Sequence, residues 1–109
     1  MLEFKSMEQV EKTPGTSVIL FTAGWCPDCV FIKPFMPQIE KEYPDVTFYT
    51  CNRDDHIELC QQLNILGIPS FVAIKDGREI GRFVSKLRKT KPEIEAWLNE
   101  TIAKGDANA

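Results

Sequence analysis

The sequence contains no apolar run long enough to cross a membrane, which disfavours a membrane-spanning protein. It also contains no basic patch, because lysines, arginines and acidic residues are interleaved and the formal net charge is −3. Nucleic-acid-binding proteins need clustered positive charge, so this class is disfavoured as well. Repeats and low-complexity segments are absent too, and the 109 residues are expected to form one domain.

The first residues, Met1 to Ser6, lack the apolar stretch of a secretory signal peptide. We therefore expect a cytoplasmic protein, with a domain over residues 1–104 and a flexible tail over residues 105–109. The cytoplasm keeps thiols reduced, so a structural disulfide is disfavoured and a catalytic use of cysteine is favoured. The chain has four cysteines to which this argument applies.

Two of these cysteines, Cys26 and Cys29, form a C-x-x-C motif between an apolar run typical of a buried strand and a pattern typical of a helix. Cys26 then lies at the start of the helix, where free backbone N–H groups and the helix dipole favour an anion. The thiolate is the nucleophilic form of cysteine. Cys29 lies one turn further on, close enough to close a disulfide, so the motif predicts a redox-active dithiol.

The hydrophobic periodicity predicts an α/β protein in which strands and helices alternate. Asp76-Gly77 predicts a hairpin turn, and Pro34 predicts a kink in the longest helix. Capping boxes begin at Ser6 and Thr90, and Asp54 or Asp55 is expected to cap a third helix. Strands are predicted over 2–5, 16–22, 46–51, 70–75 and 79–84, and helices over 6–12, 26–43, 56–63 and 91–103.

Three features together resemble the thioredoxin family over nearly the whole chain: Trp25-Cys26-Pro27-Asp28-Cys29, Pro34, and Gly67-Ile68-Pro69 before a strand. The resemblance implies a thioredoxin fold, with a central mixed sheet of about five strands flanked by about four helices. It also implies that the Pro69 peptide bond is cis and that the Ile68 backbone and Pro69 dock an extended substrate.

The sequence departs from the family pattern at several positions. Thioredoxins carry Gly-Pro between the two cysteines, whereas Pro27-Asp28 resembles thioredoxin-related proteins with a W-C-P-D-C motif. Leu20 occupies the position of a buried family aspartate, and Thr50 that of its partner lysine. Ser85 replaces a glycine near the substrate groove. These changes leave the dithiol itself intact.

The resemblance implies that Cys26 attacks a substrate disulfide and that Cys29 then displaces the reduced product. Cys29 is expected to be the less exposed thiol and to have the higher pKa. Because Leu20 offers no base, Asp28 is the candidate that deprotonates Cys29, with a solvent-facing carboxylate that only tunes the redox potential as the alternative. Trp25 is expected to contact the substrate rather than to fill the core, and Pro27 to stiffen the helix start at the docking surface.

These features predict a thiol–disulfide oxidoreductase that reduces protein disulfides in the cytoplasm as a monomer, without metal or organic cofactor. A thioredoxin-reductase-type enzyme or a low-molecular-weight thiol would reduce it again. The changes at Leu20, Thr50 and Ser85 leave a binding or adaptor module with weak redox cycling as the alternative. A metal or cluster carrier that uses the cysteines is the third possibility.

Three weaker signals remain. Cys51 and Cys60 fit small core residues, with a second disulfide, an oxidation sensor or a metal site shared with the C-x-x-C motif as alternatives. The only histidine, His56, is expected on the surface. A basic run is expected to be a solvated loop, or else to steer an acidic partner or an anionic thiol. It comprises Arg82, Lys86, Arg88, Lys89 and Lys91.

Overall fold

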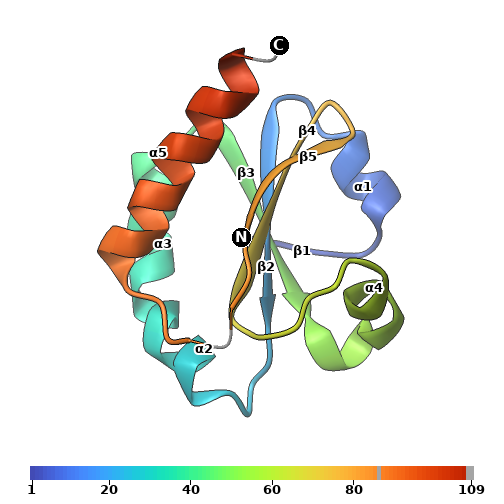
Figure 1. Cartoon of the computed structure of the whole chain (residues 1–109), viewed down its shortest axis with the longest axis vertical. Helices are drawn as coiled ribbons and strands as arrows, with labels where there is room; N and C mark the ends of the chain where they lie inside the picture. The colour runs from blue at the N-terminus through green and yellow to red at the C-terminus, as the bar shows by residue number, and fades with distance from the viewer. Residues whose placement is uncertain (86, 108–109) are drawn as a thin grey trace.

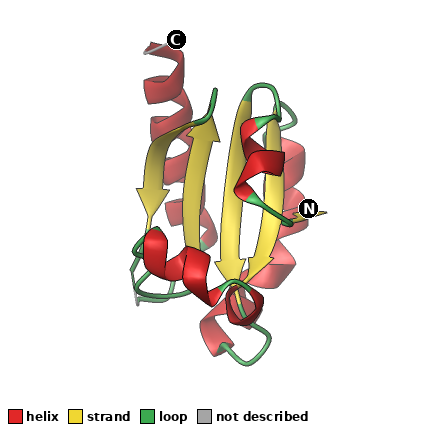
Figure 2. Ribbon diagram, turned by 90° about the vertical axis from the view of Figure 1, so that its right-hand side faces the viewer, coloured by secondary structure: helices red, strands yellow, loops and turns green. Residues whose placement is uncertain are grey.

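A computed structural model of the chain describes residues 1–85 and 87–107. A five-stranded mixed sheet lies at its centre, in the order β1-β3-β2-β4-β5. Figure 1 shows helices α3 and α5 on one face of the sheet and α1 and α4 on the other, and Figure 2 shows the strands from the side turned by 90°. The predicted α/β fold class, with the architecture of the thioredoxin fold, is confirmed.

Strands β1, β3 and β2 run parallel, and β4 runs antiparallel to both β2 and β5. Asp76 and Gly77 form the β4–β5 turn with positive φ angles of 53° and 77°, a conformation that aspartate tolerates and glycine favours. The predicted hairpin is therefore confirmed. The strands are β1 (Leu2–Glu3), β2 (Thr16–Thr22), β3 (Val46–Asn52), β4 (Ser70–Lys75) and β5 (Arg78–Phe83).

Both faces of the central strands β2 and β4 are buried, because their alternating side chains point into layers that helices cover on both sides of the sheet. From β2, Val18 and Leu20 pack with α3 and α5, whereas Ile19 and Phe21 pack with α1 and α4. The helices are α1 (Met7–Glu11), α2 (Pro27–Ile32), α3 (Met36–Glu42), α4 (Ile57–Gln62) and α5 (Lys91–Ala107), with 3₁₀ turns η1 (Lys33–Phe35) and η2 (Arg53–Asp55).

Each predicted capping box forms one of its two reciprocal hydrogen bonds. The Ser6 hydroxyl accepts a hydrogen bond from the Gln9 N–H at 3.3 Å, and the Glu93 carboxylate accepts one from the Thr90 N–H at 3.2 Å. The cap predicted for α4 is wrong. This helix begins after His56 without a side-chain cap, because Asp54 and Asp55 belong to the preceding turn η2.

Two helix boundaries also differ from the prediction. Pro34 has no N–H to donate, and the expected single helix over residues 26–43 is divided by η1 into α2 and α3. At the other end of the chain, α5 continues to Ala107 and buries Gly105, where a Cβ would lie 2.8 Å from the Ile80 side chain. The tail predicted over 105–109 is therefore helical as far as Ala107, and residues 108 and 109 lie outside the described residues.

The sheet topology gathers several chain segments at one edge. Parallel strands β2 and β3 both end there, and antiparallel β4 begins there, since Phe21 pairs with Ser70. The C-x-x-C motif follows β2, and Ile68-Pro69 precedes β4. The fold thus brings together two segments that are about forty residues apart in sequence. None of the helices in residues 1–85 and 87–107 has the length and apolarity needed to cross a membrane.

Candidate active site

Cys26 is the N-cap residue of α2, as the motif predicts. Its backbone is extended, with φ −87° and ψ 115°, and its Sγ accepts a hydrogen bond from the Cys29 N–H at 3.4 Å. On its other side the thiol donates to the Ile68 carbonyl oxygen at 3.8 Å. A backbone N–H that points at the sulfur favours the thiolate, so the geometry suits Cys26 for nucleophilic attack.

Both thiols are equally buried, at 5 % exposure each, so the prediction that Cys29 is less exposed than Cys26 is wrong. Ala23 and Ile68 pack against the pair. Burial, with a contribution from Cys26, raises the pKa of Cys29 from 9.0 to about 11, although a hydrogen bond with Thr22 lowers it. Cys29 is therefore a protonated thiol at neutral pH and must lose its proton before it can attack a disulfide.

The Ile68–Pro69 peptide bond is cis, as the resemblance implies. Pro69 is buried, whereas Ile68 is only half-buried and packs against the dithiol. The structure therefore places the Ile68 backbone directly beside Cys26, where the resemblance to thioredoxins implies that an extended substrate docks.

Trp25 is 61 % exposed, so the alternative that it fills the core is wrong. Its indole N–H donates to the Asp54 carboxylate at 2.8 Å, and the Arg53 guanidinium lies 5.8 Å from the ring centroid. A cavity of about 220 Å³ beside it is lined by Trp25, Arg53, Gly67 and Ile68 among others. Sequence analysis missed the role of Asp54, which anchors this tryptophan instead of capping a helix.

Asp28 pairs with a cation rather than with the buried thiol. Its carboxylate accepts a hydrogen bond from the Arg88 Nε–H at 2.8 Å, and the Arg88 guanidinium stacks 4.5 Å from the Phe31 ring centroid. The groups that shift the pKa of Cys29 are its burial, Cys26, Thr22 and the Ala23 backbone. These contacts favour the alternative in which Asp28 tunes the site.

A cavity of about 390 Å³ lies behind Cys29, and its lining includes Leu20, Thr22 and Thr50. Leu20 pairs with Thr50 in the β2–β3 register, so the two positions where the family pattern has an acid and a base are neighbours. Of the described residues around this cavity, none carries a carboxylate. The cavity is large enough for water, and its lining also carries the polar side chains of Lys33, Thr50 and Asn52. The Thr22 side chain forms a hydrogen bond with the Cys29 thiol.

Cys51 and Cys60 lie in the core between the sheet and helices α1 and α4. Burial raises the pKa of Cys51 to about 12, and all four cysteines are free thiols. Their packing supports the interpretation as small core residues. Within the part of the chain that the structure describes, no three His, Cys, Asp or Glu side chains gather in a group suited to a metal ion.

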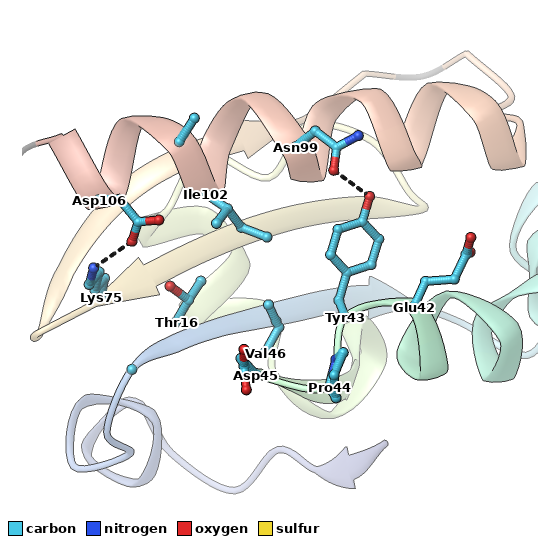
Figure 3. A pocket seen from close by; sticks show the side chains of 12 residues that line it. Thr16, Glu42, Tyr43, Pro44, Asp45, Val46, Lys75, Asn99, Ile102 and Asp106 are labelled. Carbon is cyan, nitrogen blue, oxygen red and sulfur yellow. Dashed lines mark hydrogen bonds and ion pairs between the residues drawn. The ribbon is translucent and has the colours of Figure 1, made fainter.

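A cavity of about 530 Å³ lies at the opposite end of β2 from the dithiol, where Thr16 begins the strand. Figure 3 shows Tyr43 donating a hydrogen bond to Asn99, at 2.7 Å, and Lys75 paired with Asp106 at 3.1 Å. The residues that line this cavity include no cysteine. The redox chemistry therefore does not involve this cavity.

The sequence profile of the family described as Thioredoxin matches residues 3–100 of the chain. The chain belongs to the thioredoxin family. It is 32 % identical to a thioredoxin H-type of Ricinus communis over 105 residues, which cover 94 % of this chain and 83 % of the relative. It is also 32 % identical to a thioredoxin of Sus scrofa over 85 residues, which cover 78 % of each chain.

Solved thioredoxin structures agree with this assignment. The thioredoxin of Trypanosoma brucei brucei superposes with a TM-score of 0.81 at 24 % identity, covering 94 % of this chain and 91 % of the other, which shows the shared fold. The thioredoxin of Fasciola hepatica superposes with a TM-score of 0.74 at 30 % identity, covering 95 % and 98 %. This thioredoxin-family chain is a thiol–disulfide oxidoreductase, a protein-disulfide reductase that works by dithiol exchange.

The Asp28–Arg88 ion pair leads to a first prediction. In Asp28→Asn the Arg88 cation is no longer balanced, so we expect the Cys26 thiolate to be favoured and its alkylation by iodoacetamide at neutral pH to be about twofold to fivefold faster. The rate at which Cys29 resolves a mixed disulfide should not fall. Mass spectrometry of the alkylated protein and stopped-flow kinetics measure the two steps separately.

Asp106→Asn is the matched control, because Asp106 is also a carboxylate paired with a cation, Lys75 (Figure 3). Lys75 ends β4, and the other end of this strand begins beside the dithiol. This variant should leave both rates unchanged. A tenfold or larger loss of resolution in Asp28→Asn alone would restore Asp28 as the base of Cys29.

Proposed function

We propose that Cys26 is the attacking nucleophile and Cys29 the resolving thiol of a cytoplasmic disulfide reductant. The observation that carries this assignment is the position of the Cys26 sulfur, which accepts the Cys29 N–H at 3.4 Å and adjoins the Ile68 carbonyl at 3.8 Å. The helix start stabilises the thiolate, and the adjacent backbone offers a place for the substrate chain.

The docking surface in this proposal consists of Trp25, Pro27, Ile68 and Pro69. Trp25 and Pro27 are exposed, and Ile68 is half-buried, so a substrate can reach all three. An extended substrate would pair with the Ile68 backbone and lay its apolar side chains against the indole of Trp25. Pro69 is buried and is joined to Ile68 by the cis peptide bond.

The reaction proceeds in two exchanges. The Cys26 thiolate attacks one sulfur of the substrate disulfide, a mixed disulfide forms, and the other substrate sulfur leaves as a thiolate. Cys29 then loses its proton to solvent and attacks Cys26, which releases the second substrate sulfur with its electron pair. Two electrons pass to the substrate, and the protein keeps a Cys26–Cys29 disulfide.

Regeneration of the dithiol requires an external electron donor. We assign this role to a thioredoxin-reductase-type enzyme or to a low-molecular-weight thiol, and we take the working form to be a monomer. Exposed Trp25 beside the dithiol supports a protein partner that docks on the same surface as the substrate.

The Cys26/Cys29 redox equilibrium against glutathione tests the direction of electron flow. A reductant should have a reduction potential at or below that of the glutathione pool, about −270 mV as in thioredoxins. A reduction potential of about −120 mV indicates an oxidant. Insulin reduction with each class of electron donor then identifies the one that sustains turnover. A potential in the oxidant range would overturn the proposed role as a reductant.

A further inference from the structure

Arg53 is a cation beside the docking surface that has no ion-pair partner in the described part of the chain. It belongs to the turn η2 and is half-buried. Among residues 1–85 and 87–107, no carboxylate oxygen lies within 4.0 Å of its guanidinium group. The carboxylate next to it in the sequence, Asp54, accepts the Trp25 indole N–H instead. Arginine is always protonated and carries five N–H donors, so this charge is available to a bound partner.

The predicted basic run, by contrast, has its described charges engaged within the chain. Three of its members form ion pairs: Arg82 with Glu79, Arg88 with Asp28 and Lys91 with Glu95. Lys89 is only 1 % exposed and donates to the Ser85 and Leu87 carbonyls, so the prediction of a solvated loop is wrong for this residue. Lys86 lies outside the described residues. Among the described residues near the dithiol, Arg53 is therefore the better candidate to meet an acidic partner.

A cavity connects Arg53 to the edge where the substrate docks. Its volume is about 220 Å³, and Arg53, Trp25, Leu66 and Ile68 are among the residues that line it. The Arg53 guanidinium lies 5.8 Å from the centroid of the Trp25 ring. Trp25 and Leu66 are 61 % and 74 % exposed, so the cavity can be reached from solvent. Ile68, on the same cavity, presents its carbonyl to Cys26.

The size and lining of this cavity favour a single side chain with an acidic end. Its volume lies below the roughly 300 Å³ at which small-molecule sites begin, so one side chain of a docked polypeptide fits better than a whole small ligand. The walls from Trp25, Leu66 and Ile68 are apolar and suit a methylene stem. The Arg53 guanidinium suits a carboxylate, which it can bind through two parallel N–H···O bonds. A glutamate side chain has both parts.

We propose that Arg53 is a specificity-determining residue that selects protein substrates with a glutamate close to the reacting cysteine. The glutamate carboxylate binds the Arg53 guanidinium in this cavity, while the backbone of the same segment pairs with Ile68. The inference rests on the proposed function, because it uses Cys26 as the nucleophile and the Ile68 edge as the place where the substrate docks.

Contact inside the cavity, rather than long-range attraction, has to provide this selection. Asp54 and Asp55 directly follow Arg53 and are exposed, and their negative charges oppose the approach of an acidic chain. A direct charge-assisted hydrogen bond is strong only at short range. A glutamate should therefore accelerate the reaction at one position relative to the substrate cysteine and not at the others.

Peptides whose single cysteine carries a thiopyridyl group measure this selection at the first exchange. The Cys26 thiolate attacks the peptide cysteine sulfur, a mixed disulfide forms, and pyridine thiolate leaves with the electron pair and is protonated to the coloured thione. The leaving group carries no carboxylate that could itself bind Arg53. A host peptide of neutral residues, with glutamate or glutamine placed at each flanking position in turn, gives one second-order rate per peptide.

At one flanking position, we expect the glutamate peptide to react about fivefold faster than the glutamine peptide. At the other positions the two rates should be equal. In Arg53→Gln the ratio of the two rates should fall to about one at every position. The ratio is the readout because it cancels any effect of the substitution on the reactivity of Cys26.

Charge reversal provides a second test with a gain of preference. Arg53→Glu should react faster with lysine than with glutamine at the position that glutamate occupies in the best peptide. Arg78→Gln is the matched control, because Arg78 is also an arginine without an ion-pair partner among the described residues. It begins β5 at the hairpin, whereas the dithiol lies beside the start of β4, so this variant should keep the fivefold ratio.

Equal rates for glutamate and glutamine at every position in the unmodified protein would overturn this inference. An acceleration of the same size at all positions would also overturn it, since that indicates long-range attraction, as would a preference that persists in Arg53→Gln. If the Arg53 variants do not fold, the peptide series with the unmodified protein still decides between these outcomes. Failure of the proposed function has a different signature, because Cys26→Ser would then still release the thione at the unmodified rate.

Discussion

Cys26→Ser is expected to abolish insulin reduction, with a loss on the order of a thousandfold or more, as when a catalytic nucleophile is removed. Serine fits the N-cap position and can accept the Cys29 N–H, so the fold should persist. Its hydroxyl, however, is not ionised at neutral pH and cannot attack a disulfide in this site. Turnover with the preferred electron donor and circular dichroism of the variant check both parts of this expectation.

Cys60→Ala is the control that shows whether the loss of any buried cysteine, rather than of Cys26 in particular, abolishes turnover. Cys60 is also 5 % exposed but packs in the opposite core layer, so its loss should cost only about 1–2 kcal/mol of stability and leave turnover intact. Full activity of Cys26→Ser would exclude Cys26 as the nucleophile. A stable complex with a partner protein that survives Cys26→Ser would instead support the adaptor alternative.

The architecture and the position of the dithiol could be predicted from sequence because both depend on local patterns. The β2 and β4 boundaries agree with the predicted ranges, since each apolar run is bounded by turn residues or proline. The N-cap position of Cys26 follows from a strand, a short turn and a helix-compatible pattern. Pro34 was correctly expected to disturb the helix, although its effect extends over a full 3₁₀ turn.

The surroundings of the dithiol could not be predicted, because they depend on contacts between distant segments. Asp54 contacts Trp25 across 29 residues, and Arg88 contacts Asp28 across 60 residues. In each case the sequence allowed a plausible local role, a helix cap for Asp54 and a base for Asp28. Long-range pairing overrides such local preferences, which hydrophobic periodicity and spacing do not encode.

The burial of Lys89 illustrates the same limit in a charged residue. In the sequence it belongs to a run of basic residues, which normally indicates a solvated surface. Its side chain instead turns inward because Ser85 and Leu87 supply acceptors and Phe83 supplies an aromatic face. Only the path of the loop brings these groups together, so no pattern in the sequence distinguishes Lys89 from its exposed neighbour Arg88.

Cys29→Ser should stop the reaction after its first exchange and trap the substrate. Cys26 keeps its place at the helix start and can still attack, but the serine hydroxyl cannot displace the substrate sulfur from the mixed disulfide. We expect a one-to-one adduct between Cys26 and a disulfide-containing protein, stable on a non-reducing gel and released by dithiothreitol. Multiple-turnover activity with a protein substrate should fall to the background of direct reduction.

The trapped adduct also tests how the site excludes competing thiols. Cys26 and Cys29 are each 5 % exposed and Ile68 packs against them, so an external thiol should reach the mixed disulfide more slowly than Cys29 does from within. Cys29→Ser,Cys60→Ala should trap the same adduct, because Cys60 lies in the other core layer. An adduct that fails to form, or that resolves as fast as in the unmodified protein, would contradict the order in which the two cysteines act.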